Sequence, residues 1–124
     1  MINESDLEAW DYYDPRDFDK SSSLNQYSEF VESMILTFGR DRLAENTLGL
    51  VGEAGEVSEK IKKFFRDGTI DNVAIQKELG DVIFYWVALH NALNLKPYDT
   101  IMGNMNKLKT RKRNGTIRGS GDNR

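Results

Sequence analysis

The chain has 124 residues, with 20 acidic and 17 basic side chains, one histidine and no cysteine. This length suits one domain, and at this size about two-thirds of the unfolded chain's surface can be buried without disulfides. One histidine without cysteine excludes a zinc site and thiol catalysis. No apolar stretch approaches the ~20 residues of a bilayer span, and the acidic N-terminus lacks a signal-peptide pattern, so we expect a soluble cytoplasmic protein.

Charge is distributed unevenly along the chain. Residues 1–19 hold seven acids and one base, whereas residues 107–124 hold seven bases and one acid. Oppositely charged ends can dock on each other or on neighbouring chains, and a basic tail can equally hold a polyanion. Composition leaves these alternatives open.

The N-terminal part predicts an arm followed by a first helix. Residues 1–23 combine aromatic and acidic side chains with a proline and a serine run, which predicts an irregular acidic arm. From Leu24 to Phe38 apolar residues recur every three or four positions. This spacing predicts a helix, with Ser23 as its N-cap and Gly39 as its stop.

A second helical pattern covers residues 43–65 and ends at the turn dipeptide Asp67-Gly68. Three glycines interrupt it, namely Gly49, Gly52 and Gly55. Each interior glycine costs about 0.5–1 kcal/mol relative to alanine. Three within seven residues therefore indicate the close approach of another helix or of a ligand.

A third helix is predicted from the cap residue Asp71 to about Leu95. Its centre, residues 82–89, is apolar or aromatic at every position. That run alone also fits a buried strand, but it continues without a breaker from an amphipathic stretch, and no partner strand is evident. A helix that is apolar on all sides must be covered on all sides, which favours a homo-oligomer.

A fourth helix is predicted from Pro97 to about Arg113, before Gly115. The remaining residues, 116–124, are expected to form a flexible basic tail. The sequence thus predicts an all-α protein with a four-helix-bundle-like domain over residues 24–115.

Four carboxylates share a mirrored spacing on the second and third helices. Glu53 and Glu56 are three residues apart on one helix, and Glu78 and Asp81 on the other. If the two helices fold back about the Asp67 turn, all four can meet at one level. Each pair alone is more typical of a solvated face than of a metal site. Together they repel unless a cation neutralises them, and oxygen-only ligands favour Mg²⁺ first and Mn²⁺ second.

The fourth helix offers a polar stripe beside its apolar row. Asn104, Lys107 and Arg111 lie on one side of it. Alone, this stripe is typical of a solvated basic face. Beside a metal-carboxylate cluster it predicts a phosphate clamp, because arginine binds phosphate oxygens bidentately and lysine acts as a point charge.

Three segments resemble the MazG-type nucleoside triphosphate pyrophosphohydrolases of the all-α NTP pyrophosphatase superfamily, which includes the dimeric dUTPases. They are Leu48-Gly-Leu-Val-Gly-Glu-Ala-Gly-Glu-Val, Lys77-Glu-Leu-Gly-Asp-Val and Asn104-Met-Asn-Lys-Leu-Lys-Thr-Arg. The likeness covers residues 24–124 and points to the short single-domain branch. It implies the dimeric dUTPase-type fold. The apolar run over residues 82–89 predicts that this fold assembles as a homo-oligomer, and the sequence leaves a homo-dimer and a homo-tetramer open.

The resemblance also implies a reaction and a site. The reaction is hydrolysis of a nucleoside triphosphate to the monophosphate and pyrophosphate. The implied Mg²⁺ ligands are Glu53, Glu56, Glu78 and Asp81, and the implied triphosphate contacts are Asn104, Lys107 and Arg111. The chain departs from the pattern at Gly52, where many MazG proteins carry a further glutamate.

Phosphoryl transfer of this kind needs charge neutralisation and an oriented water more than a protein nucleophile. We expect Glu53 or Glu56 to position that water or to take its proton. Lys60 and Lys63 lie near the Glu56 side of the helix and either screen the polyphosphate or only solubilise the surface.

A non-enzymatic helical interaction module, whose basic tail binds nucleic acid, is the competing interpretation. The tail has few cations and no aromatic interleaving, and the chain has no helix-turn-helix, which disfavours nucleic acid as a partner. A di-iron bundle is excluded because no Glu-x-x-His pair occurs. We expect the aromatic residues of the third helix and its histidine, His90, to have packing roles. On the first helix we also expect packing, with recognition of the nucleotide base as the alternative; the residues concerned are Asn25, Gln26, Tyr27 and Phe30.

Overall fold

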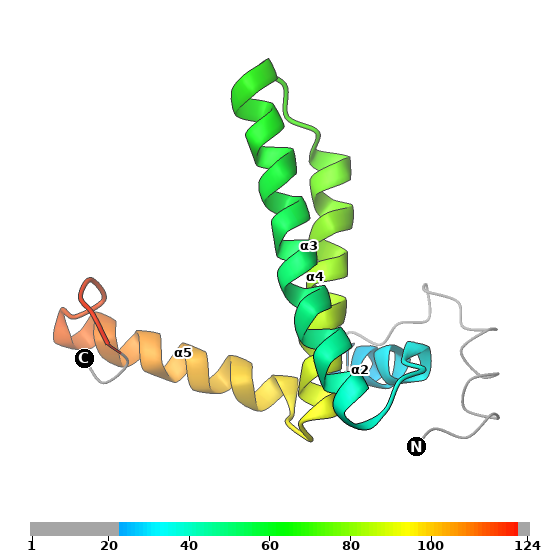
Figure 1. Cartoon of the computed structure of the whole chain (residues 1–124). Coiled ribbons are helices and arrows are strands. Elements are labelled where there is room, and N and C mark those ends of the chain that lie inside the picture. The colour runs from blue at the N-terminus through cyan, green and yellow to red at the C-terminus, as the bar shows by residue number, and fades with distance from the viewer. Residues whose placement is uncertain (1–22, 122–124) are drawn as a thin grey trace.

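Four helices make up the part of the chain that the structure describes, residues 23–121, in a computed structural model (Figure 1). They are α2 (Ser23–Met34), α3 (Gly39–Asp67), α4 (Asn72–Ala92) and α5 (Pro97–Asn114). These residues contain no strand, which confirms the all-α fold class. None of these helices is both long and apolar enough to cross a bilayer. The arm predicted upstream of Ser23 lies outside the described residues.

The helices α3 and α4 form an antiparallel hairpin, which is the most extensive packing contact among the described elements (Figure 1). Gly68 ends α3 in the left-handed region, with φ +76°, and its N–H donates to the Phe64 carbonyl at 2.7 Å. The Asp71 side chain then caps α4 by accepting from the Ala74 N–H at 2.9 Å. The predicted Asp67-Gly68 turn and the predicted Asp71 cap are both confirmed.

Two predicted helix boundaries are wrong. The first helix ends at Met34, and Gly39 begins α3 with φ +62° instead of ending the helix before it. A glycine tolerates this left-handed backbone, so the chain can reverse there at little cost. The start of α3 carries no apolar pattern, but Arg42 forms an ion pair with Glu32 of α2 that ties the two helices together. At the other boundary, α4 ends at Ala92 and does not reach residue 95.

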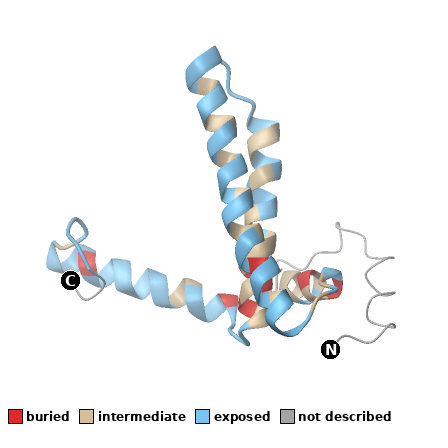
Figure 2. Cartoon of the chain, in the orientation of Figure 1, coloured by how far each residue is buried: buried red, intermediate tan, exposed pale blue. Residues whose placement is uncertain are grey.

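The core lies where α2 crosses the hairpin end nearest to α5, as the buried residues in Figure 2 show. Val31 of α2 and Val87 and Ala88 of α4 are fully buried there. The half-buried side chains that pack against them are Tyr27, Phe30, Ile35, Phe84 and Trp86. Packing roles for the aromatic residues on α2 and α4 are therefore confirmed.

A hydrogen-bonded corner sets the direction of α5. Asn94 takes φ +55°, and the Leu95 N–H donates to the His90 carbonyl at 2.8 Å. The imidazole of His90 contacts the Trp86 carbonyl at 2.7 Å through Nδ1 and the Thr100 hydroxyl at 2.6 Å through Nε2. His90 is thus a structural histidine, as predicted. From this corner α5 projects away from the hairpin (Figure 1).

The glycine at position 49 allows α3 and α4 to approach closely. A Cβ there would lie 2.4 Å from the Tyr85 ring, whereas a Cβ at Gly52 or Gly55 would meet nothing within 4 Å. The close approach of α4 therefore explains why position 49 is a glycine. Contacts within a single chain do not explain the glycines at positions 52 and 55.

We expect Gly49→Ala to lower the free energy of unfolding by about 1–3 kcal/mol, because the Tyr85 ring must move. Urea denaturation followed by circular dichroism measures the loss. Gly52→Ala is the matched control on the same helix, and it should be neutral or stabilising by up to about 1 kcal/mol. Equal effects of the two substitutions would contradict the explanation.

Candidate metal centre

Three carboxylates converge in the middle of the α3–α4 hairpin. Glu53 of α3 and Glu78 and Asp81 of α4 offer oxygen atoms that all lie within 4.8 Å of one another. Glu78 and Asp81 share a face of α4 because they are three residues apart, and the antiparallel hairpin aligns them with Glu53. We call these three residues the carboxylate cluster.

The fourth predicted ligand, Glu56, is exposed and stands one helical turn from Glu53, outside the cluster. Its charge nevertheless acts on the cluster, because it contributes to a raised pKa of Glu53. The structure therefore brings together three of the four predicted carboxylates and leaves the fourth beside them.

Desolvation and, after it, neighbouring negative charges raise the pKa of Glu53. The first cause is the partial loss of water around its carboxyl group between the two helices. The other causes are the charges of Asp81, Glu78 and Glu56 and a hydrogen bond with Glu78. No basic side chain within residues 23–121 forms an ion pair with the cluster: the ion pairs there are Arg42–Glu32, Lys62–Glu59 and Arg66–Asp67.

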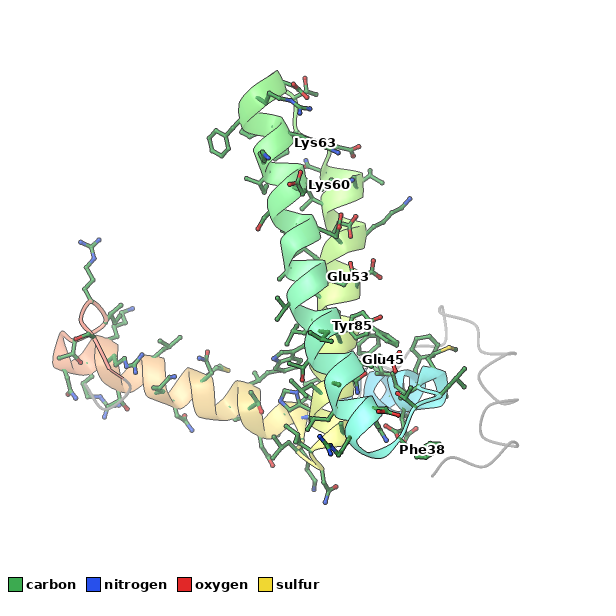
Figure 3. All side chains as sticks on the ribbon, in the orientation of Figure 1. Phe38, Glu45, Glu53, Lys60, Lys63 and Tyr85 are labelled. Carbon is green, nitrogen blue, oxygen red and sulfur yellow. The ribbon has the colours of Figure 1, made fainter. Side chains whose placement is uncertain are left out.

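The predicted lysines lie on α3 between Glu53 and the α3–α4 turn (Figure 3). Lys60 is half-buried and follows Glu53 by two helical turns, on the same face. Lys63 is exposed, and its charge contributes to the lowered pKa of Asp67, after the hydrogen bond from Arg66. Of the two lysines, only Lys60 shares the cluster's face.

The predicted triphosphate contacts lie on α5, away from the carboxylate cluster. Asn104 and Lys107 are exposed. Arg111 is only 5% exposed, and its Nη2 donates to the Gly121 carbonyl at 3.4 Å. Among the described helices, α5 packs on α2, and it projects from the hairpin in Figure 1. Within one chain the structure does not bring these residues to the cluster.

Residues 42–116 match the MazG nucleotide pyrophosphohydrolase domain. The chain belongs to this MazG family. The matched span contains the carboxylate cluster, Glu56 and the three predicted contacts on α5. The chain is also similar to the Gene 37 protein of Mycobacterium phage L5, at 48% identity over 83 residues that make up 63% of this chain and 73% of the relative. No solved structure matches the chain significantly.

Membership of the MazG family supports a nucleotide pyrophosphohydrolase activity in the broad sense. The cluster fits a metal ion on its own chemistry. Its donors are all carboxylate oxygens, which suit hard divalent cations, and their mutual repulsion is not relieved by a basic neighbour among the described residues. This MazG domain can therefore hold a metal ion between α3 and α4.

The electrostatic influence of the cluster on one residue of α2 was not predicted. Burial first, and then the charge of Asp81, raise the pKa of Tyr27. The sequence offered only its helical spacing, and spacing does not show where α2 crosses α4.

The raised pKa of Glu53 predicts a pH-dependent penalty in metal-free protein. A carboxyl whose pKa is raised on folding destabilises the fold once pH passes through that pKa, and it has no such effect below its ordinary value of 4.5. Glu53→Gln should therefore raise the melting temperature at pH 7 in chelator, and the gain should vanish near pH 4.

Thermal unfolding at several pH values checks this expectation. Glu59→Gln is the matched control. Oε1 of Glu59 lies 3.8 Å from Nζ of Lys62, and Glu59 is not part of the cluster. A gain for Glu53→Gln that is independent of pH, or an equal gain for Glu59→Gln, would contradict the electrostatic explanation.

Proposed function

We propose that this chain hydrolyses nucleoside or deoxynucleoside triphosphates to the monophosphate and pyrophosphate, with Mg²⁺ as its cofactor and Mn²⁺ as a possible substitute. The observation that carries the proposal is the carboxylate cluster, whose oxygen atoms lie within 4.8 Å of one another inside the span that matches MazG. Phosphoryl transfer requires this kind of concentrated negative charge to hold a cation against the polyphosphate.

Each carboxylate has a proposed role. Glu53, Glu78 and Asp81 hold the cation, with Glu56 completing the set from the next turn of α3. A bound divalent cation would neutralise charge on the phosphate oxygens. Glu53 or Glu56 orients the attacking water or accepts its proton.

The proposed substrate contacts are basic or amide side chains. Lys60 lies on the face of α3 that carries Glu53, where its ammonium group can meet a phosphate. The other proposed contacts are Lys63, Asn104, Lys107 and Arg111. Arg111 lies close to residue 121, so we expect it to act together with the segment that follows α5.

The test is to incubate the purified chain with each nucleoside and deoxynucleoside triphosphate and Mg²⁺ and to separate the products by chromatography. The proposal predicts equal amounts of monophosphate and pyrophosphate from at least one nucleotide. Release of diphosphate and inorganic phosphate, or no turnover of any nucleotide, would contradict it. The absence of turnover would favour the interaction-module alternative.

We further propose that the chain is a homo-oligomer, a dimer or a tetramer. Leu48 and Val51 on the outer side of α3 are 71% and 67% exposed, and Leu79 and Ile83 of α4 are also exposed. Several exposed apolar side chains on both helices of a hairpin favour association. We expect sedimentation to show no stable monomer at micromolar concentration, and a folded monomer there would contradict the proposal.

A further inference from the structure

One side of α5 carries a row of side chains that the proposed site does not use. Their positions follow one another at alternating steps of four and three residues, which places them on one face of the helix. The helical repeat sets this face opposite Lys107. We call it the basic stripe, and its residues are Tyr98, Met102, Met105, Lys109 and Lys112.

The basic stripe is apolar near the start of α5 and basic near its end. Tyr98 is 57% exposed and Met105 is 58% exposed. Lys109 and Lys112 are exposed as well, and neither forms an ion pair with a side chain of residues 23–121. A surface of this kind suits a partner that offers apolar side chains and negative charge in the matching order.

Residues 1–19, which precede the described part of the chain, have this composition. They hold seven acids and one base. Glu4, Asp6 and Glu8 lie far from α2 along the sequence, with no base among them. The aromatic side chains all fall in the half nearer to α2, and they are Trp10, Tyr12, Tyr13 and Phe18. A segment that leaves α2 and follows α5 therefore brings aromatic residues to the apolar end of the stripe and carboxylates to its lysines.

The structure places the beginning of α2 beside the beginning of the basic stripe. Leu24 and Asn25 line the same pocket as Tyr98. Ser28 Oγ donates to Asn91 Oδ1 at 2.7 Å, and Asn91 Nδ2 donates to the Ser28 carbonyl at 3.0 Å. These bonds hold the first turns of α2 against the end of α4, next to the corner from which α5 starts. The chain therefore enters α2 at the apolar end of the stripe.

The length of residues 1–19 also suits the stripe. Tyr98 and Lys112 are about 21 Å apart along the axis of α5, at 1.5 Å per residue. A segment of this length reaches about 28 Å as a helix and about 60 Å when extended. In either conformation it can cover the whole stripe of its own chain.

We propose that residues 1–19 bind the basic stripe of their own chain, with aromatic side chains against Tyr98 and Met105 and carboxylates on Lys109 and Lys112. This contact joins the two oppositely charged ends of the chain. It uses the side of α5 opposite Lys107, so it does not depend on the proposed hydrolysis.

Cross-linking of the full-length chain tests the contact directly. A water-soluble carbodiimide joins a lysine amine to a carboxylate only where the two groups touch. Chains with and without a nitrogen isotope label are unfolded together and refolded before treatment, so that any oligomer contains both. We expect mass spectrometry to find Lys109 or Lys112 linked to an acid of residues 1–19, in peptides of a single isotope. Absence of these links, or random pairing of the isotopes within them, would overturn the proposal.

Charge reversal tests whether the lysines of the stripe hold the segment. The double variant Lys109→Glu, Lys112→Glu should be cleaved by chymotrypsin within residues 1–19 about tenfold faster at low salt, because a bound segment must detach before a protease can cut it. The matched control is Lys62→Glu with Lys77→Glu, which makes the same charge change at exposed lysines of the hairpin. Its cleavage should stay within about twofold of wild type. Equal acceleration in both double variants would contradict the proposal.

Rescue by a second charge reversal separates a direct contact from a general loss of stability. Glu4→Lys, Asp6→Lys and Glu8→Lys, added to the stripe variant, recreate opposite charges with the partners exchanged. Slow cleavage should then return, with circular dichroism unchanged. Cleavage that stays fast would show that these carboxylates do not meet the stripe.

Nucleic acid is the other polyanion that a basic helix face can hold. If it occupied the stripe, the full-length chain would retain a duplex DNA probe at low salt, and Lys109→Glu with Lys112→Glu would abolish the retention. That result would overturn the contact with residues 1–19. The proposal predicts instead that the wild-type chain and the double variant bind the probe equally weakly, because the segment covers the stripe in the wild-type chain.

Discussion

Asp81→Asn and Glu53→Gln should each reduce Mg²⁺-dependent hydrolysis by about 10³-fold, because each removes a negative ligand from a cation that contributes several kcal/mol to charge neutralisation. Both replacements conserve volume, so helicity and assembly should persist. Steady-state turnover of the best nucleotide, measured beside circular dichroism and sedimentation, checks the expectation.

Glu59→Gln supplies the matched control for these variants. It neutralises a carboxylate on the same helix as Glu53, outside the cluster and 3.8 Å from Lys62. Its turnover should stay within twofold of wild type. Near-wild-type turnover in Asp81→Asn at saturating Mg²⁺ would show that the carboxylate cluster is not the site.

Removal of divalent cations should abolish hydrolysis, and Mg²⁺ should restore it, with Mn²⁺ as the second-best ion. Binding should also stabilise the fold, by about 2.7 kcal/mol when Mg²⁺ is present at a hundred times its dissociation constant. Melting temperature and turnover, recorded against Mg²⁺ concentration after treatment with chelator, report the two effects separately.

The Glu53→Gln variant distinguishes a specific metal effect from a general salt effect. Its melting temperature should rise far less with Mg²⁺ than that of wild type, because one carboxylate of the cluster is lost. Full turnover in excess chelator, or equal stabilisation of the variant, would contradict a metal centre at this position.

Local signals predicted the α3–α4 hairpin and its cluster well. The turn at Gly68 and the cap at Asp71 are encoded in a few neighbouring residues, and both are confirmed. Once that turn is fixed, antiparallel geometry alone sets Glu53 opposite Asp81. Glu56, which the same mirrored spacing places level with Glu78, is exposed and lies outside the cluster.

The direction of α5 could not be predicted in the same way. It depends on the contact between His90 and Thr100, on the left-handed Asn94, and on where α2 packs. None of these follows from the spacing of apolar residues. The sequence therefore identified the basic face of α5 correctly. It did not show where that face lies relative to the carboxylate cluster.

Phosphorus-31 NMR of a nucleoside triphosphate, incubated with the wild-type chain and Mg²⁺ and in parallel with Glu53→Gln, tests the proposed function most directly. For the wild-type chain we predict that the triphosphate signals give way to those of monophosphate and pyrophosphate, and for the variant we predict that they persist. Appearance of diphosphate and inorganic phosphate, or the same conversion in both samples, would contradict the assignment of the carboxylate cluster as a pyrophosphohydrolase site.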